Sequence, residues 1–342
     1  MADFANISEK PNAGVLDVSV STNPLGMPET VKNMDIILSL NEYYPDSECT
    51  ELRKALASKY SVQPESIYCG NGADDIIYRI SQGLKPKRGL IAAPTYEDYE
   101  AALKTIDCDI SHYIYKSEYE YHFDCGILDN ISSDIVFIAN PNNPTGELIG
   151  RKHIERLAEK CRDAGAVLVV DESFMGFTDE RESAKELVYK YSNMIVIDSF
   201  TKTYCMPGFR LGFCLCSDKS TLDKIKRAGQ ASAVSVYAQA AALMALEDKE
   251  YINLTNSYVK KEREYLIDGL NRAGLKAYNS DANFFLVKSP YNGFIKKLAD
   301  SSVIVRDCRR MTGLEGEHFR VSVKKHEDNV RFIETVYRIV NE

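Results

Sequence analysis

Short apolar runs alternate with amphipathic stretches between about residue 65 and residue 216, and this alternation restricts the chain to few folds. Runs such as AVLVV and NMIVI carry no polar alternation, which is typical of strands buried on both faces in a mostly parallel sheet. Helices fit between them. The segment 151–165 has one apolar helical face, formed by Ile154, Leu157, Ala158 and Cys161. Gly165 is expected to end this helix. The sequence therefore predicts an α/β core.

The chain changes character after about residue 233. The segment 234–274 is predicted to form a long helix, and ANFFLVKS, VIVRDC and HFRVSVK follow it as short strands. A chain of 342 residues is long enough for about two domains. We predict a large domain of residues 41–232 and a smaller α+β domain made of residues 1–40 with 233–342.

Composition excludes several classes of partner. A net charge of -8 argues against binding to nucleic acid or to an anionic membrane surface. No apolar run approaches the roughly 20 residues of a membrane-spanning helix. The first residues, MADFANISEKPNAG, lack the apolar segment of a secretion signal. We therefore expect a cytoplasmic protein that binds small molecules.

The cysteines and histidines do not form ligand patterns. The nine cysteines are odd in number and contain no C-x-x-C pair, which indicates reduced thiols. Cys214 and Cys216 lie two residues apart in LGFCLC, so a strand would point both into the core. The five histidines have no metal-ligand spacing. We expect no metal site.

Polar residues follow four apolar runs at the point where each run ends. GNGAD follows residues 67–69, and NPNNPTG follows residues 136–138. Asp171 follows AVLVV, and Lys202 follows NMIVIDSF. Asn143 precedes Asp171 by 28 residues, and Lys202 follows it by 31, which is close to the repeat of a βαβ unit. One sheet edge should therefore collect an amide, a carboxylate and an amine, where open parallel sheets bind ligands.

This set of groups suits pyridoxal 5'-phosphate. Lys202 would form a Schiff base with the aldehyde, and Asp171 would pair with the protonated pyridine nitrogen. Asn143 could donate to the ring hydroxyl from its Pro-Asn-Asn-Pro turn, and Tyr96 in APTYEDY could stack on the ring. Each group alone has a simpler explanation as a turn, a helix cap or a solvated charge. Their order and spacing favour the cofactor.

The phosphate of such a cofactor also has candidate ligands. Ser199, Thr201 and Arg210 would supply two hydroxyls and a fork-shaped cation. The GNGADD stretch would add backbone N–H groups at a helix start, where anions bind. Its candidate residues are Gly72, Ala73 and Asp74.

The segments NPNNPTG, VVDESF, SFTKTYCMPGFRLGF and FRVSV resemble the fold-type-I pyridoxal-phosphate enzymes of aminotransferase class I/II. The resemblance covers nearly the whole chain. It implies a mostly parallel seven-stranded sheet between helices in the large domain, a smaller α+β domain, and a homodimer with shared active sites. It gives the roles stated above to the cofactor residues. Tyr44 in EYYPDS would reach the phosphate of the neighbouring subunit, and Arg320 in HFRVSV would receive the substrate carboxylate, with Arg306 and Asn23 also at the substrate.

Two subgroups fit. VSVSTNPLGMP and VSVYAQAAALMAL resemble the L-threonine-O-3-phosphate decarboxylases, and Phe174 stands where most aminotransferases have a tyrosine. NPLG, YPD and GNGADD are shared with the histidinol-phosphate aminotransferases, which usually carry Ala-Gly at Pro207 and Gly208. Both subgroups bind phosphorylated substrates, and Arg306 and Arg320 would supply the two cations that such substrates need.

We expect a carbon–carbon lyase that decarboxylates L-threonine-O-3-phosphate to 1-aminopropan-2-yl phosphate in a cobalamin-type pathway. The alternative is a transaminase that uses histidinol phosphate and 2-oxoglutarate, or a related amino-acid transaminase. Two alternative functions belong to other classes of protein. A nucleotide-binding module would use GNGADD, but the chain lacks G-x-G-x-x-G and G-x-x-x-x-G-K-[ST]. A non-catalytic regulator with this fold would not need every catalytic position filled, as it is here.

Overall fold

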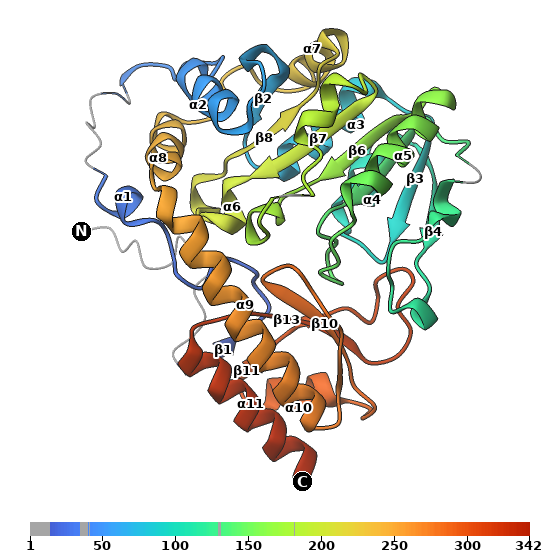
Figure 1. Cartoon of the computed structure of the whole chain (residues 1–342), viewed down its shortest axis with the longest axis vertical. Helices are drawn as coiled ribbons and strands as arrows, with labels where there is room; N and C mark the ends of the chain where they lie inside the picture. The colour runs from blue at the N-terminus through green and yellow to red at the C-terminus, as the bar shows by residue number, and fades with distance from the viewer. Residues whose placement is uncertain (1–13, 35–39, 41, 129–130, 181) are drawn as a thin grey trace.

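The computed structural model describes residues 14–34, 40, 42–128, 131–180 and 182–342. A large body that contains the main sheet lies above a smaller one, and a long helix, α9 (Lys249–Arg272), runs from the first to the second (Figure 1). The C-terminus lies at the far end of the smaller body.

The large body is built on a seven-stranded sheet with the order β2-β8-β7-β6-β5-β3-β4. Only β8 runs antiparallel to its two neighbours, β2 and β7, so the prediction of a mostly parallel sheet is confirmed. The direction in which successive strands are added changes between β3 and β5, which is where open α/β sheets bind ligands. In chain order the strands are β2 Ile67–Gly70, β3 Arg88–Ala93, β4 Asp109–Ile114, β5 Ile135–Ala139, β6 Val167–Asp171, β7 Met194–Ser199 and β8 Gly212–Leu215.

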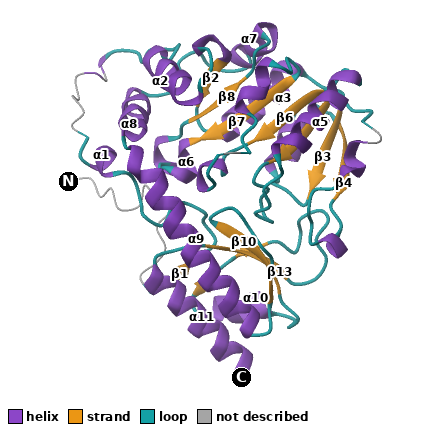
Figure 2. Ribbon diagram, viewed as in Figure 1, coloured by secondary structure: helices purple, strands orange, loops and turns teal. Residues whose placement is uncertain are grey.

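Helices cover both faces of this sheet (Figure 2). Val170 packs in one core cluster and its neighbour Val169 in another, as expected for strands buried on both faces. On α5 the four residues of the predicted apolar face are all buried, and the chain turns at Gly165 with a φ of +71°. The helices of this body are α1 Glu29–Lys32, α2 Thr50–Tyr60, α3 Ala73–Leu84, α4 Asp98–Lys104, α5 Arg151–Asp163, α6 Phe200–Thr203 and α7 Lys219–Arg227.

Short 3-10 turns complete the connections of the large body. They are Pro64–Ser66, Ser117–Tyr119, Cys125–Leu128, Met175–Phe177, Lys185–Tyr189 and Pro207–Phe209.

The smaller body holds two small sheets. One is antiparallel with the order β12-β13-β10-β9, and the other is the parallel pair β1 and β11. The predicted strands in ANFFLVKS and HFRVSVK are present, but VIVRDC divides at Val305 into two short strands that join different sheets. The elements are β1 Leu16–Asp17, β9 Lys276–Ala277, β10 Phe284–Lys288, β11 Val303–Ile304, β12 Arg306–Asp307 and β13 His318–Ser322, with helices α10 Phe294–Asp300 and α11 His326–Asn341.

The long helix predicted over residues 234–274 is instead two helices. The first, α8 (Val236–Glu247), is followed by Asp248, whose carboxylate accepts a hydrogen bond from the Tyr251 N–H and caps α9. The buried alanines of α8 pack in the same core cluster as the large sheet, and so does Val31 of α1. By this packing α1 and α8 belong with the large sheet, whereas the predicted boundaries place residues 1–40 and 233–342 in the smaller domain.

None of the helices in the described ranges is long and apolar enough to cross a bilayer. The eight cysteines whose side chains are described are free, and Cys214 and Cys216 both pack in the core cluster predicted for them.

Candidate active site

A cavity of about 450 Å³ lies where the carboxyl edge of the large sheet faces the smaller body. It is lined by residues that follow β2, β3, β5, β6 and β7 and by two arginines of the smaller body. All but three of the predicted site residues line it, namely Ala73, Asp74, Tyr96, Asn143, Asp171, Ser199, Thr201, Lys202, Arg210, Arg306 and Arg320.

Lys202 lies on α6, a single turn that begins directly after β7. The turn is fixed at its start because Ser199 Oγ accepts a hydrogen bond of 3.0 Å from the Thr201 N–H. Burial lowers the pKa of Lys202 to about 8, and the positive charges of Arg320 and Arg210 add to this effect. A lysine with a lowered pKa has more of its neutral amine at neutral pH, which is the form that attacks a carbonyl.

Asp171 is the last residue of β6, and hydrogen bonds fix both of its carboxylate oxygens. Oδ1 accepts from the N–H and hydroxyl of Ser173, at 2.9 and 2.6 Å, and Oδ2 accepts from the Tyr99 hydroxyl at 2.6 Å. Burial raises the pKa of Asp171, while the bonds from Ser173 and Tyr99 oppose that change by stabilising the carboxylate. Sequence reasoning missed both partners. Tyr99 lies three residues after Tyr96, and Ser173 two after Asp171, which was the available signal.

Asn143 and Tyr96 flank the switch point between β5 and β3. Asn143 Oδ1 accepts a hydrogen bond of 2.6 Å from Arg320 Nη1, which leaves the amide nitrogen of Asn143 as a donor. The Tyr96 hydroxyl donates to Asp74 Oδ1 at 3.1 Å, and its ring meets Tyr99 edge-on at a centroid distance of 5.7 Å. An amide donor and an aromatic ring therefore line the cavity on either side of this point.

The N-terminus of α3 and Arg210 form a candidate anion site at one end of the cavity. Ala73 and Asp74 are the first residues of α3, where backbone N–H groups lack helical partners. Gly72 precedes them with a φ of +92°, and a Cβ there would lie 2.9 Å from Arg210 Nη2. Glycine thus allows both the turn and the close approach of the guanidinium. Arg210 Nη2 is 3.3 Å from Asp74 Oδ2.

Arg306 and Arg320 are directly opposite one another on β12 and β13. Arg320 is buried, its Nη2 donates to the Ser19 carbonyl at 2.7 Å, and its Nε has no hydrogen-bond partner. Burial, together with the charge of Arg306, lowers the pKa of Arg320 to about 10, so its guanidinium stays charged at neutral pH. Arg306 is half-exposed, and its Nη2 lies 2.7 Å from Glu97 Oε2. This ion pair joins the two bodies at the cavity.

Three predicted residues do not line the cavity. Gly72 lies beside Arg210, which does line the cavity, and the Tyr44 side chain is 94% exposed. Asn23 differs from its predicted role at the substrate because its side chain is used within the fold. Its amide nitrogen donates to the Thr203 carbonyl and to Thr255 Oγ1, both at 2.8 Å, and its backbone N–H donates to the Lys202 carbonyl. Asn23 therefore holds the end of α6 against α9.

The donor set fits pyridoxal 5'-phosphate. The cavity volume of about 450 Å³ is in the range of small-molecule sites, about 300 to 1,000 Å³. A partly buried amine, a buried carboxylate, an amide donor, an aromatic ring and a candidate anion site surround one space. The unpartnered Nε of Arg320 indicates that a further acceptor belongs at the arginine side of the cavity.

Comparison with known proteins agrees with this geometry. The family model "Aminotransferase class I and II" matches residues 15–336. The chain is 28% identical to a threonine-phosphate decarboxylase of Salmonella typhimurium, over 95% of this chain and 91% of the other. It is 33% identical to histidinol-phosphate aminotransferase 2 of Archaeoglobus fulgidus, over 96% of this chain and 94% of the other.

Solved structures give the same fold. A histidinol-phosphate aminotransferase from Clostridium acetobutylicum superposes with a TM-score of 0.88 at 29% identity, covering 96% of this chain and 99% of the other. That of Sinorhizobium meliloti, in complex with pyridoxal-5'-phosphate, has a TM-score of 0.82 at 18% identity, covering 95% and 90%. The match along the chain and the assembled groups lead to one conclusion: this chain belongs to the class I and II aminotransferase family, and it is a pyridoxal-phosphate-dependent enzyme.

Proposed function

We propose that this protein decarboxylates L-threonine-O-3-phosphate to 1-aminopropan-2-yl phosphate. The observation that carries the proposal is the cross-strand pair Arg306 and Arg320 beside Lys202 in one cavity. Two guanidinium groups on adjacent strands suit a small substrate that has a carboxylate and a phosphate. The threonine-phosphate decarboxylase of Salmonella typhimurium, similar along almost its whole length, supports the same substrate class.

The chain's own residues have separate tasks in this reaction. Pyridoxal 5'-phosphate, when bound, withdraws the electrons of the bond that breaks at the substrate α-carbon. Lys202 would hold the cofactor, and its Nζ could deliver a proton to that carbon. Asp171 would keep a proton on the ring nitrogen, and Asn143 would donate to the ring oxygen. Arg210 and the N-terminus of α3 would hold the cofactor phosphate.

Substrate anions would meet two different arginines. Arg320 is buried and preorganised by Asn143 and Ser19, which suits a carboxylate that must be held in one orientation. Arg306 is at the rim, where Glu97 already pairs with it. A substrate phosphate would displace Glu97 because a dianion binds a guanidinium more strongly than one carboxylate does.

Phe174 supports decarboxylation over proton transfer at the same carbon. Its ring lines the cavity with the centroid 5.8 Å from Lys202 Nζ, and it packs edge-on against Phe284. The ring adds no hydroxyl beside the lysine, so it supplies an apolar wall there. The bond that is held perpendicular to the cofactor ring is the one that breaks. An apolar wall beside the substrate carboxylate would favour decarboxylation, because it destabilises the charged carboxylate relative to neutral carbon dioxide.

The second candidate is transamination of histidinol phosphate with 2-oxoglutarate. It is favoured by the 33% identity to the Archaeoglobus fulgidus aminotransferase and by the TM-score of 0.88 to the Clostridium acetobutylicum enzyme. The same two arginines would bind its substrates, and Lys202 would then move the α-proton.

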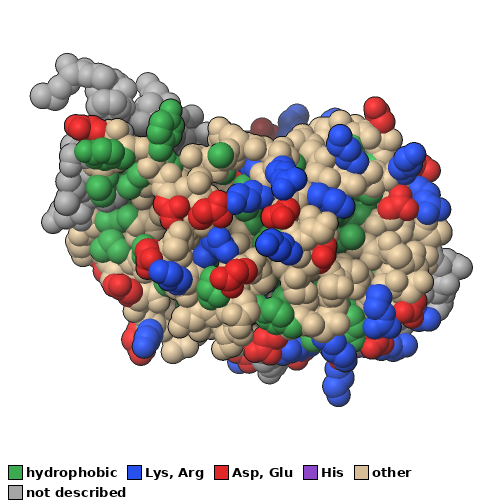
Figure 3. Space-filling view, turned by 90° about the horizontal axis from the view of Figure 1, so that it is seen from above, with side chains coloured by type: hydrophobic (Ala, Val, Ile, Leu, Met, Phe, Trp, Pro, Cys, Tyr) green, Lys and Arg blue, Asp and Glu red, His purple; other side chains and the backbone are tan. Residues whose placement is uncertain are grey.

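We also propose a homodimer with shared active sites. Leu40, Tyr43 and Tyr44 are exposed, by 46%, 71% and 94%, and Tyr43 shares a surface hollow with Arg210. Hydrophobic side chains also gather on the side of the molecule where α2 and α8 lie (Figure 3). A second copy seated there would bury these rings and bring Tyr44 to the partner's cofactor phosphate.

Mass spectrometry of products tests the proposal. The purified protein is mixed with L-threonine-O-3-phosphate and no keto-acid acceptor, and a parallel sample receives histidinol phosphate and 2-oxoglutarate. Loss of carbon dioxide in the first sample is the expected result. Glutamate formed only in the second sample would replace the proposal with the aminotransferase. The absence of product in both samples would contradict both proposed substrates.

The variant Lys202→Ala is the control for the cofactor itself. It should lose turnover and the visible absorbance of the lysine-bound cofactor, because no other amine is available at that position in the described cavity lining. Turnover that survives this change would contradict the role of Lys202.

A further inference from the structure

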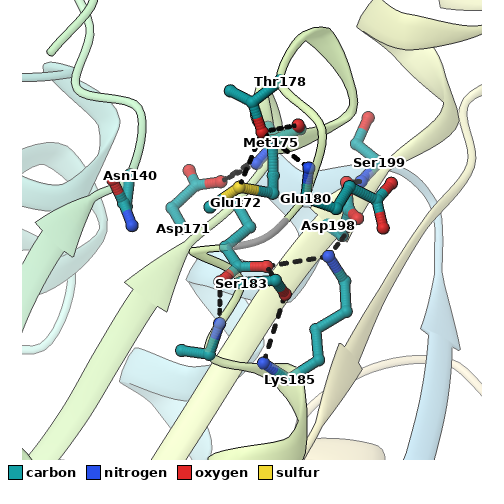
Figure 4. A network of polar contacts seen from close by, with 12 residues as sticks. Asn140, Asp171, Glu172, Met175, Thr178, Glu180, Ser183, Lys185, Asp198 and Ser199 are labelled. Carbon is teal, nitrogen blue, oxygen red and sulfur yellow. Dashed lines mark hydrogen bonds and ion pairs between the residues drawn. The ribbon is translucent and has the colours of Figure 1, made fainter. Parts of the chain in front are cut away.

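A buried ion cluster lies behind the cofactor residues, and the reaction as proposed does not use it. Lys185 Nζ is 2.7 Å from Glu172 Oε2 and 2.9 Å from Asp198 Oδ2, and all three side chains are buried (Figure 4). The same ammonium lies 4.7 Å from the centroid of the Tyr60 ring. Two carboxylates and one aromatic face thus take up the three N–H groups of one lysine.

The cluster is joined by the chain to the site. Glu172 directly follows Asp171, and Asp198 directly precedes Ser199, at the ends of the neighbouring parallel strands β6 and β7. Because successive residues of a strand point to opposite faces, both acids of the cluster face away from the side on which Asp171 lies. Lys185 therefore links the ends of β6 and β7 on the face of the sheet opposite to Asp171.

One arm of the cluster leads to Lys202. Asp198 Oδ1 accepts a hydrogen bond of 2.6 Å from the Ser199 N–H, and Ser199 Oγ in turn caps the turn that carries Lys202. Burial raises the pKa of Asp198 to about 6, and Lys185 opposes this by stabilising the carboxylate. The acid therefore depends on the lysine for its charge near neutral pH.

The other arm leads to Asp171. Glu172 Oε1 accepts from the Ala184 N–H at 2.6 Å, and Oε2 accepts from the Ser183 hydroxyl at 2.7 Å. The Glu172 carbonyl accepts from the Met175 N–H, which closes the turn that contains Ser173, the partner of Asp171. The position of Glu172 thus fixes the turn that orients the Asp171 carboxylate.

We propose that Lys185 is a positioning residue that sets the separation of Asp171 and Lys202 across the cofactor ring. It neutralises two carboxylates that would otherwise repel each other at adjacent strand ends. The inference rests on the proposed cofactor site and not on the identity of the substrate. Among the described residues, Glu180 and Lys59 also lie near this cluster, with Lys59 Nζ 3.9 Å from Glu180 Oε1.

The test is the variant Lys185→Met, studied as the holoenzyme. Its matched control is Lys190→Met, which removes an ion pair of 2.5 Å with Glu155 from a lysine whose side chain is 59% exposed. Absorbance titration gives the pH midpoint of the lysine-bound cofactor, and dialysis gives its dissociation constant. For Lys185→Met we expect the midpoint to move by about 0.5 pH unit or more and the dissociation constant to rise about tenfold. Lys190→Met should match the wild type.

A purely structural role would give a different result. Lys185→Met would then unfold at lower temperature while its midpoint and dissociation constant equal those of the wild type, and this would overturn the inference. If Lys185→Met does not fold, Asp198→Asn decides, because it keeps an acceptor for the Ser199 N–H and leaves Lys185 with one acid. An unchanged midpoint in Asp198→Asn also overturns the inference. A wild type without visible absorbance would instead overturn the cofactor site itself.

Discussion

Replacing Tyr99 with phenylalanine should shift the pH range in which the protein binds its cofactor. The Tyr99 ring is 1% exposed and stacks on Phe137 at 5.2 Å, and phenylalanine keeps these contacts. The change removes only the hydroxyl that donates to Asp171 Oδ2 at 2.6 Å. A hydrogen bond to a charged group contributes about 1.5–3 kcal/mol, so the affinity of Asp171 for a proton should rise about 10- to 100-fold.

The assay is the cofactor dissociation constant measured as a function of pH. In the proposed site the cofactor ring would bind Asp171 with a proton on its nitrogen, so a protonated Asp171 would first have to lose its proton. Below the pKa of Asp171 in the cofactor-free protein, affinity therefore falls about tenfold for each pH unit. Burial already raises this pKa, and loss of the Tyr99 donor raises it further. The acid limb is the pH range in which cofactor affinity falls, and for the Tyr99→Phe protein it should lie about one to two pH units above that of the wild type.

The chain offers a matched control for this experiment. Tyr191 is also 1% exposed, its hydroxyl donates to Glu159 at 2.7 Å, and neither residue is among those that line the cavity. Tyr191→Phe should reproduce the wild-type acid limb. Superimposed limbs for the wild type and Tyr99→Phe would refute the argument that Tyr99 holds the charge of Asp171.

Three further results are expected. Arg320→Lys keeps a charge but loses the fork geometry, so KM for the phosphorylated substrate should rise about 10- to 100-fold with little change in cofactor affinity; an unchanged KM in steady-state assays would contradict this. Glu97→Gln frees Arg306, so KM should fall about two- to fivefold at low salt and less at high salt, and a rise in KM would count against displacement by the substrate. Cofactor uptake by the apoprotein should accelerate about tenfold per pH unit up to the Lys202 pKa of about 8, as stopped-flow absorbance can measure, and a flat rate from about pH 6 would show that the amine is already neutral.

The carboxyl-edge residues were predictable because sequence distance and sheet geometry agree. Each βαβ unit returns the chain to the same edge, so Asn143, Asp171 and Lys202 must meet there once the intervening runs are strands. The apolar face of α5 was predictable for a similar reason, since helical spacing alone decides which side is buried.

Other features depend on partners that are remote in the sequence. The amide of Asn23 binds Thr203 and Thr255, which are 180 and 232 residues away, so a polar residue in an N-terminal loop gave no sign of its use within the fold. The pairing of Glu97 with Arg306, 209 residues apart, has the same character. Such contacts are set by how the two bodies meet, and no local pattern encodes them.

The division of labour between the bodies has a consequence for selectivity. The groups that we propose for the cofactor lie at the carboxyl edge of the large sheet, whereas Arg306 and Arg320 come from a separate small sheet. Arg320 is connected to the large body by its hydrogen bond to Asn143, and Arg306 by its ion pair with Glu97. A change at these junctions should move the substrate anions relative to the cofactor ring without loosening the ring itself. Because the bond perpendicular to the ring is the one that breaks, such changes would alter which reaction occurs before they alter cofactor affinity.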